Sequence, residues 1–108
     1  MADLISQKIL SHDQMTAVAP DEIKGFLGAL KEGWEFLETQ KITKEFKFDN
    51  FIKAMEFVNK VAQIAEKEGH HPDIAIHYNK LEITLWSHYI NGLSLNDFII
   101  AAKIDSIT

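Results

Sequence analysis

A run of alternating apolar and polar residues between positions 74 and 85 is the feature that most constrains the fold. Apolar side chains occupy every second position on each side of a short polar break: Ile74, Ile76, Tyr78, Leu81, Ile83 and Leu85. A period of two is typical of strands that bury one face. Asn79 and Lys80 can form a two-residue turn between the two runs. The pattern therefore predicts an antiparallel hairpin with one apolar face.

A second hairpin is predicted over residues 34–48, where the same alternation recurs. Ile42, Phe46 and Phe48 share one face of its second strand. Lys44 is the charged exception on that face. Both hairpins thus offer an apolar face to the rest of the chain.

Three helices are predicted around the hairpins, because apolar residues recur at helical spacing over residues 20–32, 51–68 and 95–104. The order is helix, two strands, helix, two strands, helix. We therefore predict an α+β domain in which three helices pack on one face of a four-stranded antiparallel sheet.

Residues that favour helix ends stand at the predicted boundaries. They are Pro20 and Gly33 for the first helix, Asp49 or Asn50 and Gly69 for the second, and Ser94 with Asp97 as a capping box for the third. The second helix is also expected to bury a broad apolar stripe made of Phe51, Ile52, Met55, Val58, Val61, Ala62 and Ala65.

Composition narrows the class of protein. The 108 residues are enough for one domain, and 46% of them are apolar. The net charge of −5 disfavours direct binding to nucleic acid. The absence of cysteine excludes disulfides and a thiolate zinc site. No apolar run is long enough to span a membrane and the first residues do not form a leader sequence, so we expect a soluble cytoplasmic protein.

Histidines cluster at the end of the second predicted helix and after the second hairpin. His70 and His71 are adjacent and are followed by Pro72, which holds the residue before it extended. With Asn79 and Lys80 as the turn, the strand register would place His71 opposite His88, on the sheet face that the helices leave free. Because histidine titrates near neutral pH, such a cluster favours acid–base chemistry.

Other interpretations of the same region stay open at this point. Three imidazoles can bind zinc, but adjacent histidines on an extended chain point in different directions, which disfavours a metal site. Glu66 is either a surface charge or a site carboxylate, and Asp97 is either a helix cap or a site residue. Trp86 on the uncovered face indicates a ligand or a subunit contact. His12 and His77 are interpreted as surface residues.

The stretch EKEGHHPDIAIHYNKLEITLWSHYINGLSLNDF, at residues 66–98, resembles the pterin-4a-carbinolamine dehydratase family. The resemblance extends over about residues 20–106 and leaves residues 1–19 as an N-terminal extension of a dehydratase-like domain at 20–108. It is carried by Glu66, Lys67, His70, His71, Pro72, Tyr78, Asn79, His88, Gly92, Leu93, Ser94 and Asp97.

The resemblance implies an enzyme, 4a-hydroxytetrahydrobiopterin dehydratase, a hydro-lyase of tetrahydrobiopterin recycling. Such enzymes remove water from a 4a-hydroxytetrahydropterin to give quinonoid dihydropterin, and they need no metal or organic cofactor. It implies catalytic roles for His70, His71 and His88. We expect His71 and His88 to handle protons while His70 holds the pterin. The expected substrate-binding residues are Glu66, Pro72, Trp86, Ser87 and Asp97.

The resemblance also implies partners and alternatives. The expected partners are the small-molecule pterin and further copies of the chain, in a homodimer or homotetramer, without nucleic acid or a membrane. Some relatives act as transcriptional coactivators or assembly factors, so a non-enzymatic binding module is the second hypothesis. A metal-dependent hydrolase, which rests on the histidine cluster and not on the resemblance, is the third hypothesis.

Overall fold

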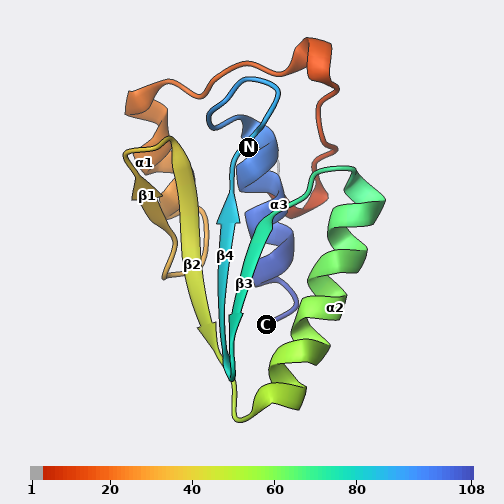
Figure 1. The fold of residues 1–108 in the computed structure, drawn as a ribbon. Helices are drawn as coiled ribbons and strands as arrows, with labels where there is room; N and C mark the ends of the chain where they lie inside the picture. The colour runs from red at the N-terminus through yellow and green to blue at the C-terminus, as the bar shows by residue number, and fades with distance from the viewer. Residues whose placement is uncertain (1–3) are drawn as a thin grey trace.

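The computed structural model describes residues 4–108 as an antiparallel sheet with helices against one of its faces (Figure 1). The strands are β1 (Glu35–Leu37), β2 (Lys41–Lys47), β3 (Asp73–His77) and β4 (Lys80–Leu85), in the order β1-β2-β4-β3. The helices are α1 (Pro20–Gly28), α2 (Phe51–Glu68) and α3 (Leu95–Asp105), and short 3-10 turns lie at Leu4–Ser6 and His12–Gln14. The predicted α+β class, with three helices and a four-stranded antiparallel sheet, is confirmed.

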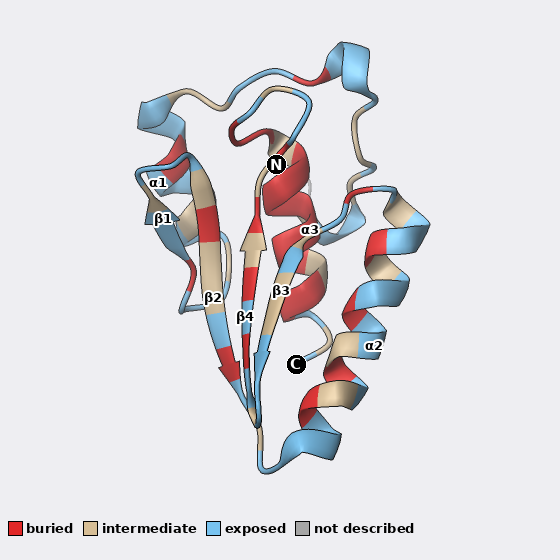
Figure 2. Ribbon diagram, viewed as in Figure 1, coloured by how far each residue is buried: buried red, intermediate tan, exposed pale blue. Residues whose placement is uncertain are grey.

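Buried residues recur at every second position along β4, as the alternation predicts (Figure 2). On the face toward the helices, the buried side chains are Ile42 and Phe46 of β2 and Leu81, Ile83 and Leu85 of β4. They pack with Phe57 and Val61 of α2 and with Phe98, Ile100 and Ile104 of α3 in one hydrophobic core. On the other face, Glu45 is directly paired with Glu82, and both are exposed.

The register of the β3–β4 hairpin differs from the prediction by two residues. Ile83 pairs with Ile74 rather than Ile76, and the turn consists of Tyr78 and Asn79. Tyr78 adopts a left-handed backbone conformation with φ 56°. A shift of two residues keeps the same side chains on each face, so Leu81, Ile83 and Leu85 of β4 are buried as predicted although the predicted pairs are wrong. Ile76 and Tyr78, which were expected on the core face, are exposed, because β3 is the edge strand and Tyr78 lies in the turn.

A contact with Phe48, the residue after β2, explains the position of this turn. The side-chain amide of Asn79 donates to the carbonyl of Phe48 at 2.9 Å, and the Phe48 amide donates to the carbonyl of Asn79 at 2.8 Å. Both bonds need Asn79 inside the turn. They join segments that are 31 residues apart, so the local pattern could not reveal them.

Two helix predictions need correction. Helix α1 ends at Gly28, five residues before Gly33, because Gly25 and Gly28 weaken its helical preference and the amide of Ala29 closes its last turn on the Phe26 carbonyl. In α2 the buried residues are Ala54, Phe57, Val61 and Ala65, whereas Phe51, Ile52 and Ala62 are exposed. The first turn of α2 lies at the tips of the strands, where the sheet no longer covers it (Figure 2).

The predicted caps of α2 and α3 are confirmed. Of the two candidates at the start of α2, Asn50 is the cap, since its side chain accepts from the Lys53 amide at 2.9 Å. Ser94 caps α3, and Asp97 completes the capping box. Gly69 ends α2 in the left-handed conformation with φ 69°. Among residues 4–108, none of the helices combines the length and apolar character that crossing a membrane requires.

Gly69→Ala should lower the free energy of unfolding by about 1–2 kcal/mol, because a side chain disfavours the left-handed conformation. Gly25→Ala is the matched control. Gly25 lies inside α1, and an added Cβ would meet no atom within 4 Å at either glycine. The control should raise stability by about 0.4–1 kcal/mol. Urea denaturation gives the free energy of unfolding of both variants. Equal values for Gly69→Ala and Gly25→Ala would contradict a role for the left-handed conformation of Gly69.

Candidate active site

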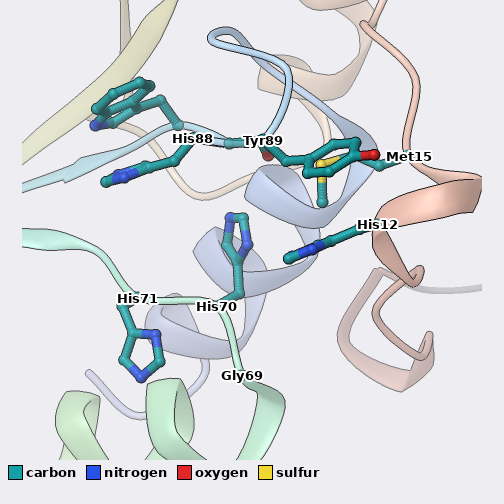
Figure 3. A pocket seen from close by; sticks show the side chains of 9 residues that line it. His12, Met15, Gly69, His70, His71, His88 and Tyr89 are labelled. Atoms are coloured by element: carbon teal, nitrogen blue, oxygen red, sulfur yellow. The ribbon is translucent and has the colours of Figure 1, made fainter.

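A cavity of about 480 Å³ opens where three segments meet (Figure 3). Its lining comes from the α2–β3 connection (Gly69, His70 and His71), the loop after β4 (Trp86, Ser87, His88 and Tyr89) and the N-terminal segment (His12 and Met15). This volume lies within the usual range for small-molecule sites. The structure thus brings the three histidines singled out in the sequence to one pocket, together with Trp86 and Ser87.

His70 is the most firmly held of the three. Its ring is buried, and Nε2 lies 2.6 Å from Oδ1 of Asp97. Asp97 is completely buried, and its Oδ2 accepts from the Ser94 amide at 3.0 Å and from the Ser87 hydroxyl at 2.8 Å. The carboxylate therefore has hydrogen bonds at both oxygens, and it lies at the positive end of α3. Asp97 is both a helix cap and the partner of His70.

The chain direction after α2 separates the two adjacent histidines. Gly69 turns the backbone off the helix in the left-handed conformation, and the rings of His70 and His71 then point in different directions (Figure 3). His70 turns inward, whereas the ring of His71 is directed toward α2 in Figure 3. There, Nε2 of His71 lies 2.9 Å from Oε2 of Glu66. Because both side chains are mostly exposed, this pair contributes little to stability.

His88 is held by Trp86, which lies two residues earlier in the chain. Its ring stacks on the indole of Trp86, with 3.8 Å between centroids and 23° between planes. Trp86 is fixed in turn, because its Nε1 donates to Oδ2 of Asp73 at 3.0 Å. The ammonium of Lys41 lies 4.5 Å from the indole centroid. Trp86 therefore orients His88 from the wall of the pocket.

The expected opposition of His71 and His88 is wrong. β4 ends at Leu85 and β3 begins at Asp73, so neither histidine lies in the strand ladder. A bridge between Ser87 and Gly92 closes a turn immediately after β4, and that turn carries His88. The histidines share the pocket, but not through cross-strand pairing.

The other expected substrate-binding residues divide into two groups. Trp86 and Ser87 line the cavity, whereas Glu66, Pro72 and Asp97 are not part of its lining. Glu66 and Asp97 instead contact the rings of His71 and His70. Among residues 4–108, no group of three or more His, Asp or Glu side chains is arranged to hold a metal ion.

Four lining residues were not singled out from the sequence as site residues: Gly69, which was interpreted only as a helix cap, and His12, Met15 and Tyr89. His12, interpreted as a surface residue, is exposed but reaches the cavity, where its ring stacks on Tyr89 with 4.8 Å between centroids. Met15 is buried beside it.

In the same N-terminal segment, the Ser11 hydroxyl donates to the carboxylate of Asp13 and holds the pKa of that carboxyl below its ordinary value. No periodicity or motif near residue 12 marks this segment as part of a site.

Fold and site together define a small α+β domain with a pocket of orientated histidines, one of them paired with a buried carboxylate. Comparison with known proteins identifies the domain. The family model described as pterin 4 alpha carbinolamine dehydratase matches residues 16–107, so the chain belongs to this family.

Curated relatives and a solved structure agree with that assignment. Proteins named "Putative pterin-4-alpha-carbinolamine dehydratase" from Alkaliphilus metalliredigens and Nitrosospira multiformis are each 46% identical, over 82% and 86% of this chain and 79% and 80% of theirs. A structure from Brucella melitensis, titled transcriptional coactivator/pterin dehydratase, has a TM-score of 0.81 at 34% identity, over 85% of this chain and 98% of that one.

A more distant structure shares the fold. It is described as a pterin dehydratase-like protein that serves as a RuBisCO assembly factor in the alpha-carboxysome. Its TM-score is 0.61 at 23% identity, over 71% of this chain and 90% of that one.

Proposed function

We propose that this protein is a 4a-hydroxytetrahydropterin dehydratase, a hydro-lyase that forms quinonoid dihydropterin. The observation that carries the proposal is the buried Asp97–His70 pair at a 480 Å³ pocket that His71 and His88 also line. Membership of the pterin carbinolamine dehydratase family supports a pterin as the substrate.

The reaction needs two proton transfers and no change in oxidation state. The bond between C4a and the hydroxyl oxygen breaks, and the oxygen takes a proton to leave as water. N5 loses its proton, and the electrons of its N–H bond form the C4a–N5 double bond. One group must donate a proton and another must accept one. Histidine serves both purposes near neutral pH, and positioned groups of this kind accelerate reactions about 10²–10⁴-fold.

His70 fits the role of proton acceptor. Since the Asp97 carboxylate accepts the Nε2–H of His70, a neutral His70 carries its lone pair on Nδ1. The carboxylate also stabilises the imidazolium that forms when Nδ1 takes up a proton. This assignment replaces the expectation that His70 only holds the pterin, which depended on His71 and His88 facing each other.

His88 and His71 receive different roles in this proposal. His88, fixed against Trp86, is assigned as the donor of the proton to the departing hydroxyl. Nε2 of His71 is engaged by the carboxylate of Glu66 at 2.9 Å, and His71 is assigned to substrate binding. Ser87 would act through Asp97, to which its hydroxyl donates.

The first test follows the decay of enzymatically generated 4a-hydroxytetrahydropterin by ultraviolet absorbance. The native protein should accelerate the decay, His88→Ala should abolish most of the acceleration, and His71→Ala should chiefly raise KM. His77→Ala is the matched control, since His77 is exposed at the end of β3 and does not line the pocket. Native protein that is no faster than the blank, in a reaction that a known dehydratase accelerates, would refute the dehydratase proposal.

A non-enzymatic binding module is the alternative, and the descriptions of the two solved structures favour it as second choice. One names a transcriptional coactivator as well as a dehydratase, and the other names an assembly factor. Normal folding without dehydratase activity would support this alternative. A role in tetrahydrobiopterin recycling, a cytoplasmic location and assembly into a homodimer or homotetramer stay predictions.

A further inference from the structure

Residues 10–18, here called the N-terminal strap, are fastened at both ends next to the pocket. The Leu10 amide donates to Oδ1 of Asn96 at 2.7 Å, and Nδ2 of Asn96 donates to the Leu10 carbonyl at 3.0 Å. At the other end, the Val18 amide donates to the Leu93 carbonyl at 2.9 Å. Asn96 is completely buried and immediately precedes Asp97. The first turn of α3 therefore fixes both the strap and His70.

The middle of the strap forms a wall of the pocket. Met15 is buried, and both Met15 and His12 line the cavity. In Figure 3 the ring of His12 reaches toward His70 from the side of the pocket away from His71. It stacks on Tyr89 with 23° between the ring planes. Since His12 and Tyr89 are both exposed, their stack presents aromatic surface at the opening of the pocket.

Anchoring the strap does not account for this stack. The bonds to Asn96 and Leu93 and the burial of Met15 already hold the strap in place. An exposed pair of rings at the mouth of a cavity adds little to such anchoring, but it offers a flat surface to a flat ligand. Pterins are planar heterocycles, which gain from contact with aromatic faces.

We propose that His12 is a substrate-binding residue that, with Tyr89, forms an aromatic wall against the pterin. This inference rests on the proposed dehydratase function and adds a fourth histidine to its site. His12 lies on the N-terminal strap, whereas His70 and His88, the groups assigned to proton transfer, come from the other two segments that line the cavity. His12 is therefore assigned to binding and not to proton transfer. Such a contact stabilises bound substrate and transition state alike, and its loss raises KM while kcat is retained.

The test compares His12→Ala with His12→Phe, which keeps a flat ring. His12→Ala should raise KM about 3- to 10-fold, the effect of one aromatic contact, with kcat within about twofold of native. His12→Phe should keep KM within about twofold of native, and His77→Ala is the control for loss of a histidine elsewhere. Binding of 7,8-dihydropterin, followed by tryptophan fluorescence, gives a second readout that does not require turnover.

The outcomes separate this inference from the proposed function. An active native enzyme whose KM is unchanged in His12→Ala overturns the role of His12 and leaves the dehydratase proposal intact. Equal increases in KM for His12→Ala and His12→Phe assign recognition to the imidazole nitrogens and overturn the aromatic wall. An inactive native protein refutes the dehydratase, and the binding experiment then decides on His12. Absence of both activity and binding overturns both proposals.

Discussion

Asp97→Asn should lower kcat about 10²–10⁴-fold with little change in the fold. The asparagine oxygen can still accept from the Ser94 amide and the Ser87 hydroxyl, which both donate to Oδ2 in the native protein. Its amide group then faces Nε2 of His70, where the native carboxylate oxygen lies at 2.6 Å. An amide donates, so Nε2 must become the acceptor and the ring proton must move to Nδ1. His70 thereby loses the lone pair that the proposed reaction uses.

Three measurements distinguish this effect from general damage. Nitrogen NMR should report the change of His70 from the Nε2–H to the Nδ1–H tautomer, which a purely structural role of Asp97 would not produce. His70→Ala should lower kcat by a similar factor, and the double variant should be no slower than either single variant, since the two residues act as a unit. Full activity in Asp97→Asn, or multiplied losses in the double variant, would contradict the assignment of His70 as base.

Local signals in the sequence predicted local structure well. Gly69, Ser94 and Asn50 end or begin helices as expected, because each cap depends on bonds within a few residues. Alternation likewise predicted which face of β4 is buried. It could not predict the register, which depends on Asn79 reaching Phe48 of a different hairpin.

The same distinction applies to the site. The resemblance over residues 66–98 drew attention to His70, His71 and His88, and the structure places them at one pocket. The sequence indicated that Asp97 caps a helix, but only the fold shows that its other oxygen meets His70, 27 residues away. The position of His12 at the pocket could not be predicted from the sequence, because it depends on hydrogen bonds between segments 86 residues apart.

Lys44 is a further case: the alternation showed a charged residue on an otherwise apolar face, but it did not explain why the residue is there. Its position in β2 faces the core, and its Nζ lies 2.8 Å from Oδ1 of Asp105 at the end of α3. Only 13% of the Lys44 side chain and 5% of the Asp105 side chain are exposed. Oδ2 of the same carboxylate accepts from Nε1 of Trp34 at 3.0 Å and from the Lys31 amide at 3.1 Å. The charged exception on an apolar face is thus one half of a buried ion pair.

Lys44→Met should lower the free energy of unfolding by about 3–5 kcal/mol, because it leaves the buried Asp105 carboxylate without a compensating charge. Lys53→Met is the matched control. Lys53 pairs with Glu56 at 3.7 Å with more than half of each side chain exposed, and its loss should change stability by less than about 0.5 kcal/mol.

The double variant Lys44→Met with Asp105→Asn tests the cause. Removing the carboxylate charge removes the reason for the loss, while the asparagine oxygen can still accept from Trp34 and Lys31. The double variant should therefore be more stable in urea than Lys44→Met alone, although it carries one more substitution. If instead the two losses add, the destabilisation comes from lost packing of the lysine stem and not from an unpaired charge. The ion pair would then be incidental to the stability of the sheet–helix core.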